Sequence, residues 1–449
     1  MSNLETFTTK PILISASSFY PRNYNPKYLL VKEGMNDYPC ISDYISGDIK
    51  GGSTPPAYFF YEDKEAGIPF IKTSAVTRHI INVNDLQIIN TDYHRKTLKR
   101  SIIKPYDVIF TMTGKFMGKA AMCPKTIAEM NMSQNSVVFH TNSKEEAAFL
   151  TIFLNSDINR IQIRGNYSIT KQKFLNQGKI ASLHVVPYKK EYDSLMKEYL
   201  SAFDGYYSAL ENIQKIINKF ETDMDLTYKD EPVYSFIVKA GHFDRRMLAP
   251  NFYRDDVKET ITKIVGDYTQ LETDNIRKGD EVGSANYLEE GVPFIKTSDI
   301  VNYDLDYEPD CYCGEAFLSQ LAQDIKKGDV IFAKDGKPGE VAIVQEDCNV
   351  VISSGLVKYH PSNEEEGLWV FLLLASKFGK AYFKKWFVIA STMLHLRADF
   401  FEDFKIPTVD DTIRNTYLTP LKKCINQRAE SYNKMQEIRK NVEQSFMEQ

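Results

Sequence analysis

The string Pro69-Phe-Ile-Lys-Thr-Ser74 recurs unchanged as Pro293-Phe-Ile-Lys-Thr-Ser298, at an offset of 224 residues. In a chain of 449 residues, a six-residue repeat arises by chance on the order of once in a hundred sequences. Internal repeats indicate that a structural unit has been duplicated. The rest of the sequence is therefore expected to divide into two copies.

Matches on both sides of this string occur in the same order. Asp107-Val-Ile-Phe110 recurs as Asp329-Val-Ile-Phe332, and Gly114-Lys115 recurs as Gly336-Lys337, both at an offset of 222. Single-residue matches at offsets from 224 down to 220 pair Phe19 with Phe243, Arg22 with Arg246, Pro26 with Pro250, Ser133 with Ser353, His140 with His360 and Pro187 with Pro407. A slowly falling offset indicates small loop deletions in the second copy, and the ordered set predicts a tandem duplication.

Each copy divides into a strand-rich region, an apolar helix and a long helix. Ile68–Ile71 and Val108–Thr111 have the β-branched and aromatic content of strands, and glycines bound them. The apolar stretches Ala147–Asn155 and Leu368–Ser376 predict one shorter helix in each copy. The order of predicted elements is therefore the same in both halves of the chain.

Apolar residues spaced three or four apart predict a long helix at the end of each copy. They are Leu195, Tyr199, Phe203, Tyr206, Leu210, Ile213, Ile217 and Phe220 in the first copy, and Leu421, Ile425, Met435, Ile438 and Val442 in the second. Thr419-Pro420 indicates an N-cap and a first-turn proline, so a helix running back to Ile413 is expected to kink or break there. Each stripe could pack on its own domain, but two matching seams favour pairing of the helices with each other.

The composition is that of a folded protein, with 43% apolar and 26% charged residues. No apolar run has the length of a membrane span, and the first residues lack the pattern of a secretory signal. The six cysteines show no spacing typical of zinc ligands. We therefore expect a cytoplasmic protein with reduced thiols and no membrane partner.

The net charge of −5 is an average over unlike segments. Residues 1–190 carry 24 Lys and Arg against 15 Asp and Glu, whereas residues 225–409 carry 21 against 32. Within the first copy, residues 151–190 hold seven basic residues against one acidic residue. A basic face can exist on an acidic protein, so the net charge does not exclude a nucleic-acid partner.

Motifs of common catalytic sites are absent from the sequence. It contains no Gly-x-x-x-x-Gly-Lys-Ser/Thr phosphate loop, no Gly-x-Ser-x-Gly nucleophile elbow and no His-Glu-x-x-His helix. Asp335-Gly-Lys337 near Glu340 suggests a nuclease pattern, but the matching Thr113-Gly-Lys115 has no carboxylate. We therefore assign no catalytic residue and no metal ligand.

The repeated strings resemble the target recognition domains of the specificity subunits of type I restriction–modification systems. The resemblance rests on Gly-Ile/Val-Pro-Phe-Ile-Lys-Thr-Ser, followed by Asp-Val-Ile-Phe and a Gly-Lys turn, and extends from about Phe19 to Phe446. It implies an α+β fold in which two tandem mixed α/β target recognition domains are separated by two long antiparallel coiled-coil helices, with pseudo-two-fold symmetry. The expected parts are an N-terminal extension (1–18), target recognition domain 1 (19–189), spacer helix 1 (190–224), a linker (225–242), target recognition domain 2 (243–409) and spacer helix 2 (410–449).

The resemblance also implies a function, namely recognition of a bipartite target on double-stranded DNA by a subunit without catalytic activity. The implied partners are two modification subunits, which use S-adenosylmethionine to methylate adenine at N6, and restriction/translocase subunits, which use ATP and Mg²⁺. No cofactor is expected on this chain. Two alternatives remain open: a stand-alone nuclease associated with a methyltransferase, and a structural adaptor that acts through its helices.

Basic residues occur at corresponding places in both copies, and Lys and Arg on phosphates supply most of the affinity for DNA. The predicted contacts are Arg160, Arg164, Lys171 and Lys173 in the first copy, Lys377, Lys384, Lys385 and Arg397 in the second, and Lys115 and Lys337 in the two Gly-Lys turns. Base-reading residues are expected where the copies differ. Candidates of this kind are Arg78, His79, Arg95 and Lys334.

Overall fold

The computed structural model describes residues 25–61, 67–169, 173–229, 237–239, 241, 249–264, 267–270, 273–390, 393–397 and 399–447. The predicted extension 1–18, Lys171 and much of the predicted linker lie outside these ranges. The chain forms two compact units: unit 1 comprises residues 1–208 and 430–449, and unit 2 comprises residues 209–429. Both contain helices and strands, which confirms the mixed α and β content that the sequence predicts.

Unit 1 contains short strands and five helices of its own among the residues described. Its strands are β1 (Lys50–Gly51), β2 (Phe60–Tyr61), β3 (Ile68–Ile71), β4 (Gln87–Ile89), β5 (Val108–Thr111), β6 (Ala120–Met122), β7 (Asn131–Met132), β8 (Ser136–Phe139), β9 (Ser168–Ile169) and β10 (Lys173–Phe174). Its helices are α1 (Pro26–Gly34), α2 (Thr91–Lys96), α3 (Lys144–Asn155), α4 (Asp157–Asn166) and α5 (Gln177–Ala181), joined by the first part of α6 (Asp193–Asp223).

Unit 2 has a similar series of elements. Its strands are β11 (Asp267–Gln270), β12 (Ile276–Lys278), β13 (Val292–Ile295), β14 (Ile300–Val301), β15 (Asp304–Leu305), β16 (Tyr312–Cys313), β17 (Val330–Ala333), β18 (Val341–Ile343), β19 (Val351–Ile352), β20 (Leu356–Tyr359), β21 (Phe387–Ala390), β22 (Met393–Leu396) and β23 (Lys405–Thr408). Its helices are α7 (Asp255–Thr262), α8 (Ala316–Leu321), α9 (Glu364–Ala375), α10 (Lys377–Trp386) and α11 (Asp399–Asp403), joined by the first part of α12 (Asp411–Met447).

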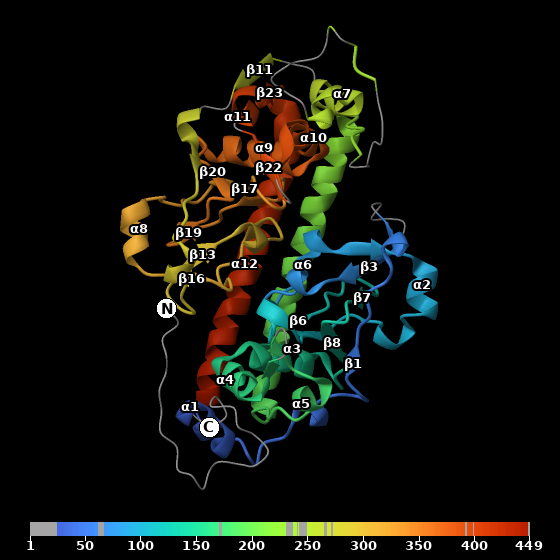
Figure 1. The fold of residues 1–449 in the computed structure, drawn as a ribbon, viewed down its shortest axis with the longest axis vertical. Coiled ribbons are helices and arrows are strands. Elements are labelled where there is room, and N and C mark those ends of the chain that lie inside the picture. The colour runs from blue at the N-terminus through green and yellow to red at the C-terminus, as the bar shows by residue number, and fades with distance from the viewer. Residues whose placement is uncertain are drawn as a thin grey trace. The chain divides into compact units, whose positions relative to one another are not determined.

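Each unit has a four-stranded antiparallel sheet with the same order of strands. The order is β1-β8-β5-β6 in unit 1 and β12-β20-β17-β18 in unit 2. A helix packs on each sheet in the same way, α3 on β5 and β6, and α9 on β17 and β18 (Figure 1). Ser143 and Asn363 cap these helices, so both begin before the apolar stretches that predicted them.

The repeated Pro-Phe-Ile string forms a core strand in both units, as the sequence predicts. In β3, Phe70 and Ile71 are fully buried and pair in parallel with β7. In β13, Phe294 and Ile295 are fully buried and pair in parallel with β19. Identical apolar residues therefore occupy identical places, because both positions are enclosed by neighbouring strands and by packed side chains.

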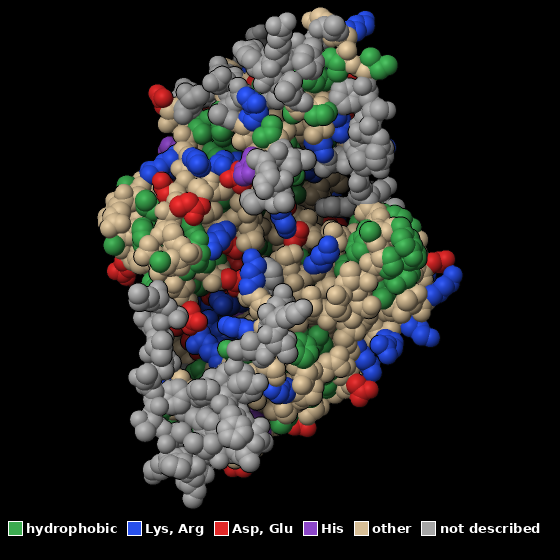
Figure 2. Space-filling model, viewed as in Figure 1, with side chains coloured by type: hydrophobic (Ala, Val, Ile, Leu, Met, Phe, Trp, Pro, Cys, Tyr) green, Lys and Arg blue, Asp and Glu red, His purple; other side chains and the backbone are tan. Residues whose placement is uncertain are grey.

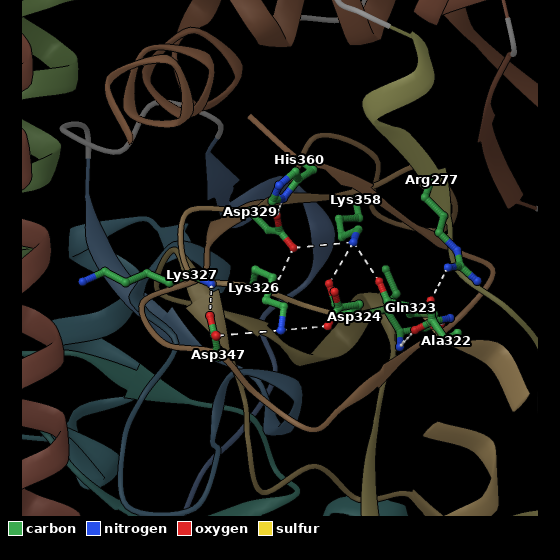
Figure 3. Close-up of polar contacts among 11 residues, drawn as sticks. Arg277, Ala322, Gln323, Asp324, Lys326, Lys327, Asp329, Asp347, Lys358 and His360 are labelled. Atoms are coloured by element: carbon green, nitrogen blue, oxygen red, sulfur yellow. Dashed lines mark hydrogen bonds and ion pairs between the residues drawn. The ribbon is translucent and has the colours of Figure 1, made fainter. Parts of the chain in front are cut away.

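A matching Asp–His pair holds the start of the central strand in each unit. Asp107 Oδ1 lies 2.8 Å from His140 Nδ1, and Asp329 Oδ1 lies 2.6 Å from His360 Nδ1. In both cases the second carboxylate oxygen accepts a backbone N–H from the preceding turn. Figure 3 shows that Lys358 also approaches Asp329, at 3.7 Å. These carboxylates are buried, and such groups are stable only when they are paired and hydrogen-bonded.

Helix α6 confirms the long helix that the sequence predicts at the end of the first copy. The buried members of the predicted stripe are Tyr199, Phe203, Tyr206, Leu210, Ile213, Ile217 and Phe220. Leu195 is only half-buried, whereas the adjacent Met196 is fully buried. The buried stripe therefore begins one residue later than predicted.

Helix α12 begins at Asp411, so the predicted N-cap at Thr419 is wrong. The helix continues through Pro420, which lies inside it. Asp410 provides the start instead, because its carboxylate accepts the backbone N–H of Thr412 at 2.8 Å. A proline inside a helix removes one hydrogen bond and crowds the carbonyl four residues earlier, and a buried apolar stripe can offset that cost. The buried residues of the predicted stripe are Leu421, Ile425, Met435, Ile438 and Val442.

Within unit 1, α6 and the last part of α12 run antiparallel. Tyr192, just before α6, bonds to Ser445 at 2.9 Å, and further along α6 the ring of Tyr206 lies 6.0 Å from that of Tyr432. As the residue number rises along α6, the number of the α12 residue that it contacts falls. Gly205 permits this approach, because a Cβ there would lie 2.8 Å from Ser431 Oγ. A larger residue at this position would require the Ser431 side chain to move.

Within unit 2, α12 bonds to the strand pair β14–β15. Arg428 is 1% exposed, and its guanidinium donates to the Asn302 carbonyl at 2.7 Å and to Asp304 at 2.8 Å. Burial raises the pKa of Asp304, and the neighbouring Arg428 acts in the opposite direction. Arg428 and Asp304 thus place two buried charges where α12 meets β14 and β15. Each charge depends on the other for its stabilisation.

Replacing Arg428 with Met should lower the free energy of unfolding by about 3 kcal/mol, because Asp304 would lose its buried partner. An acid whose pKa is higher in the folded than in the unfolded state destabilises the fold when it is ionised. Part of the lost free energy of unfolding should therefore be recovered as the pH falls toward about 4, where Asp304 takes up a proton. Urea unfolding at several pH values measures both effects. Arg414→Met on the same helix, where the partners Glu365 and Asp411 are exposed, should change stability by less than about 1 kcal/mol. Equal losses in the two variants would contradict the expectation.

Candidate nucleic-acid interface

A glycine–lysine turn follows the central strand of each unit. Gly114 has φ of +71° and Gly336 has φ of +74°, in the left-handed region that favours glycine. The lysines that follow them, Lys115 and Lys337, are exposed. The prediction that the glycine sets the turn is confirmed, and the turn presents a lysine at the surface in both units.

In unit 1, a hairpin from later in the chain lies beside this turn. The hairpin consists of β9 and β10, and Phe174 of β10 forms a bridge with Thr113. The backbone N–H of Leu175 donates to the carbonyl of Met112 at 3.0 Å. Lys173, also in β10, is therefore held near the turn that carries Lys115.

Unit 2 has the corresponding arrangement. The hairpin consists of β21 and β22, and His395 of β22 forms a bridge with Asp335. The backbone N–H of Leu396 donates to the carbonyl of Lys334 at 2.8 Å, and that of Gly336 donates to Leu394 at 3.0 Å. In both units, segments far apart in the sequence thus form one turn-and-hairpin face.

The predicted DNA-binding residues of unit 1 differ in their surroundings. Arg164 and Lys173 are exposed, and the Lys173 ammonium lies 5.4 Å from the centre of the Tyr167 ring. Arg160, one turn before Arg164 on α4, forms an ion pair with Asp157. Arg160 is also only half-buried, whereas Arg164 and Lys173 are exposed, so these two are the better candidates for contact with a phosphate.

In unit 2, two of the predicted residues have structural roles. Lys385 is 16% exposed, bonds to Asp403 at 2.5 Å, and lies over the Phe252 and Trp386 rings. Lys377 begins α10 and lies 3.6 Å from Glu221. These interactions favour a local structural function over contact with DNA. The other two predicted residues, Lys384 and Arg397, are half-buried.

The structure places the candidate base-reading residues less favourably for contact with DNA than the sequence suggests. Arg78 lies in the turn between Val76 and Ile81, which bridge each other, and Ile81 exchanges two backbone hydrogen bonds with the Tyr207 hydroxyl of α6. His79 in the same turn is 2% exposed, so its prediction as a base-reading residue is wrong. This turn docks on the helix, and its conformation is set by that contact.

Two further candidates are paired with carboxylates. Arg95 lies 3.4 Å from Glu129. The Lys334 ammonium bonds to Asp335 and is 15% exposed. Sequence reasoning missed the pairing of Asp335 with His395, which only the hairpin brings together. The available signal was the difference between the copies at this turn, Thr113 in one and Asp335 in the other.

The surface is not uniformly basic. Figure 2 shows Lys and Arg side chains interspersed with Asp and Glu on the face drawn. Among the residues described, no group of three or more His, Cys, Asp and Glu side chains is arranged to hold a metal ion. A search of the same residues finds no helix with the length and apolar character needed to cross a membrane.

A comparison with protein families identifies a domain that part of the chain resembles. Residues 273–438 match the family described as "Type I restriction modification DNA specificity domain". This part of the chain therefore resembles a type I DNA specificity domain. It includes the turn at Gly336, the hairpin β21–β22 and most of α12.

Solved structures of type I specificity subunits resemble the chain only loosely. The S subunit of a type I restriction–modification system from M. genitalium is 13% identical, with 91% of this chain and 96% of that chain covered and a TM-score of 0.32. The HsdS subunit from Thermoanaerobacter tengcongensis is 14% identical, with 90% and 94% covered and a TM-score of 0.27. TM-scores this low add nothing to the argument about the architecture. A comparison with curated proteins finds no match.

Within residues 273–438, lysines with structural roles should contribute more to the free energy of unfolding than exposed lysines do. Lys385→Met removes the bond to Asp403 and should lower the free energy of unfolding by about 1–2 kcal/mol. Lys337→Met removes an exposed charge and should change it by less than about 0.5 kcal/mol. Thermal and urea unfolding of the two variants measure this. A Lys385 variant as stable as the Lys337 variant would return Lys385 to the candidate DNA contacts.

Proposed function

We propose that the chain is the non-catalytic specificity subunit of a type I restriction–modification complex and that it reads a bipartite DNA target. The observation that carries the proposal is the match of residues 273–438 to the DNA specificity domain. The identical order of strands in the two central sheets supports a second domain of the same kind in unit 1. On this proposal the tandem domains are related by a pseudo-two-fold axis, and each reads one half of the target.

The turn-and-hairpin face of each unit is the proposed DNA surface. Its exposed cations are Lys115 and Lys173 with the nearby Arg164 in unit 1, and Lys337 in unit 2. Contacts from such side chains to phosphates supply affinity and orient a protein on the duplex, while contacts to base edges supply the sequence preference. The acidic character of unit 2 is compatible with this role, because only the face next to DNA needs to be basic.

The proposed partners are two modification subunits and the restriction/translocase subunits. Methylation of adenine requires the base to leave the stack and enter a catalytic pocket. We assign that pocket, together with S-adenosylmethionine, to the modification subunits, and we assign ATP and Mg²⁺ to the restriction subunits. The exposed surfaces of α6 and α12 are the proposed docking elements, since both helices run through the two units. The chain itself would then only position its partners on the DNA.

Removing the surface cations should change the salt dependence of DNA binding. The triple replacement of Lys115, Arg164 and Lys173 with Ala should reduce the slope of log K against log salt by about 0.9 for each phosphate that is no longer neutralised. The sequence preference should persist, because these side chains position the protein without reading bases. Binding of duplex DNA by the assembled complex, titrated at several salt concentrations, provides the measurement. Arg160→Ala is the matched control, since its charge is already paired with Asp157 and its slope should equal that of the wild type.

Exchange of one domain should alter one half of the target. We expect that replacing residues 243–409 with the matching domain of a related protein changes one half-site and leaves the other unchanged. Mapping of methylated adenines in cells that carry the hybrid and the modification subunits gives the readout. A change in both half-sites would refute independent reading. Methyl transfer or cleavage by the isolated chain would favour the enzymatic alternative, and binding without sequence preference would favour the adaptor.

A further inference from the structure

Asp335, beneath the hairpin of unit 2, has bonds on both carboxylate oxygens. Oδ1 lies 2.8 Å from Nδ1 of His395, and Oδ2 accepts from the ammonium of Lys334. Asp335 and Lys334 are each 15% exposed, whereas the His395 side chain is 36% exposed. The carboxylate and the ammonium are therefore mostly covered, and the imidazole is the part of the group that reaches the surface.

The bond to Asp335 determines which nitrogen of His395 is available. A carboxylate can only accept, so Nδ1 must carry the proton that it donates. In a neutral imidazole the other nitrogen, Nε2, is then an acceptor. Within the described part of the chain, Nε2 has no hydrogen-bond partner. In its neutral form, His395 thus presents one oriented acceptor on the turn-and-hairpin face.

The same backbone positions carry different side chains in unit 1. Phe174 and Thr113 form the bridge that His395 and Asp335 form in unit 2. Met112 accepts the backbone hydrogen bond that corresponds to the one accepted by Lys334. All three side chains of the group therefore differ between the units, while the glycine–lysine turn beside them is the same. A framework that is constant while the side chains of one group on it vary is what two domains that read different half-sites require.

We propose that His395 reads one base of the second half-site in the major groove, with Asp335 and Lys334 as positioning residues. This inference rests on the proposed function. A phosphate offers acceptors only, so an acceptor at Nε2 gains nothing from the DNA backbone. In the major groove, the exocyclic amines of adenine and cytosine are donors, whereas guanine and thymine present acceptors on the corresponding atoms. His395 therefore selects adenine or cytosine over guanine or thymine at one position.

The test compares motifs methylated by the full chain in complex with its modification subunits. His395→Phe, which introduces the side chain found at the matching position of unit 1, should relax one position of the second half-site. The preference there should fall about tenfold or more, and the first half-site should be unchanged. The double replacement Lys334→Met and Asp335→Thr installs the side chains of unit 1 and leaves no covered ammonium unpaired, so it should relax the same position without loss of thermal stability, which a purely structural role would not produce. If the Phe variant fails to fold, His395→Leu, which also removes the acceptor, serves in its place.

His360 provides a matched control, because it is exposed and bonded to a carboxylate in the same unit but lies at the start of the central strand. His360→Phe should leave the methylated motif unchanged. An unchanged motif in the His395 and Asp335 variants would overturn the inference, and so would a wild-type preference for guanine or thymine at the relaxed position. Absence of any methylated motif with the wild-type chain would instead refute the proposed function, so the two failures are distinguishable.

Discussion

A fully buried inner strand of the four-stranded sheet organises each unit. All four residues of β5 and all four of β17 are buried, so each strand needs neighbours at both edges and packed side chains on both faces. The Asp–His pair holds the start of the strand, and the glycine–lysine turn ends it at the surface. The position of the turn, and of the hairpin that pairs with it, follows from the burial of this strand.

Burial also separates two kinds of basic residue that look alike in the sequence. Lys385 and Lys358 are covered, and each is bonded to a carboxylate or to backbone carbonyls. Lys115 and Lys337 are exposed at turns. A covered ammonium must have partners within the protein, because the cost of removing it from water is otherwise not offset. An exposed ammonium has no such requirement and can exchange water and counterions for a phosphate.

On the proposed function, the two units differ where a pair of recognition domains must differ. Their core strands, capped helices and glycine turns correspond, and the side chains of Met112, Thr113 and Phe174 are replaced by Lys334, Asp335 and His395. A backbone framework can be kept through duplication because its interactions do not depend on the exposed side chains. Sequence preference can then change by substitution on that framework, without loss of the fold.

The sequence by itself determined the duplication, the core strands, the apolar helices and the long helix α6. These features depend on local periodicity and on repeated strings, which are visible without a fold. The prediction from sequence failed at Pro420, where the buried stripe of α12 offsets the hydrogen bond that proline removes. Only the tertiary structure decided which cations are exposed, that His79 is buried, and that Asp335 meets His395. Those properties depend on contacts between segments distant in the chain, and residue type and spacing carry no information about such contacts.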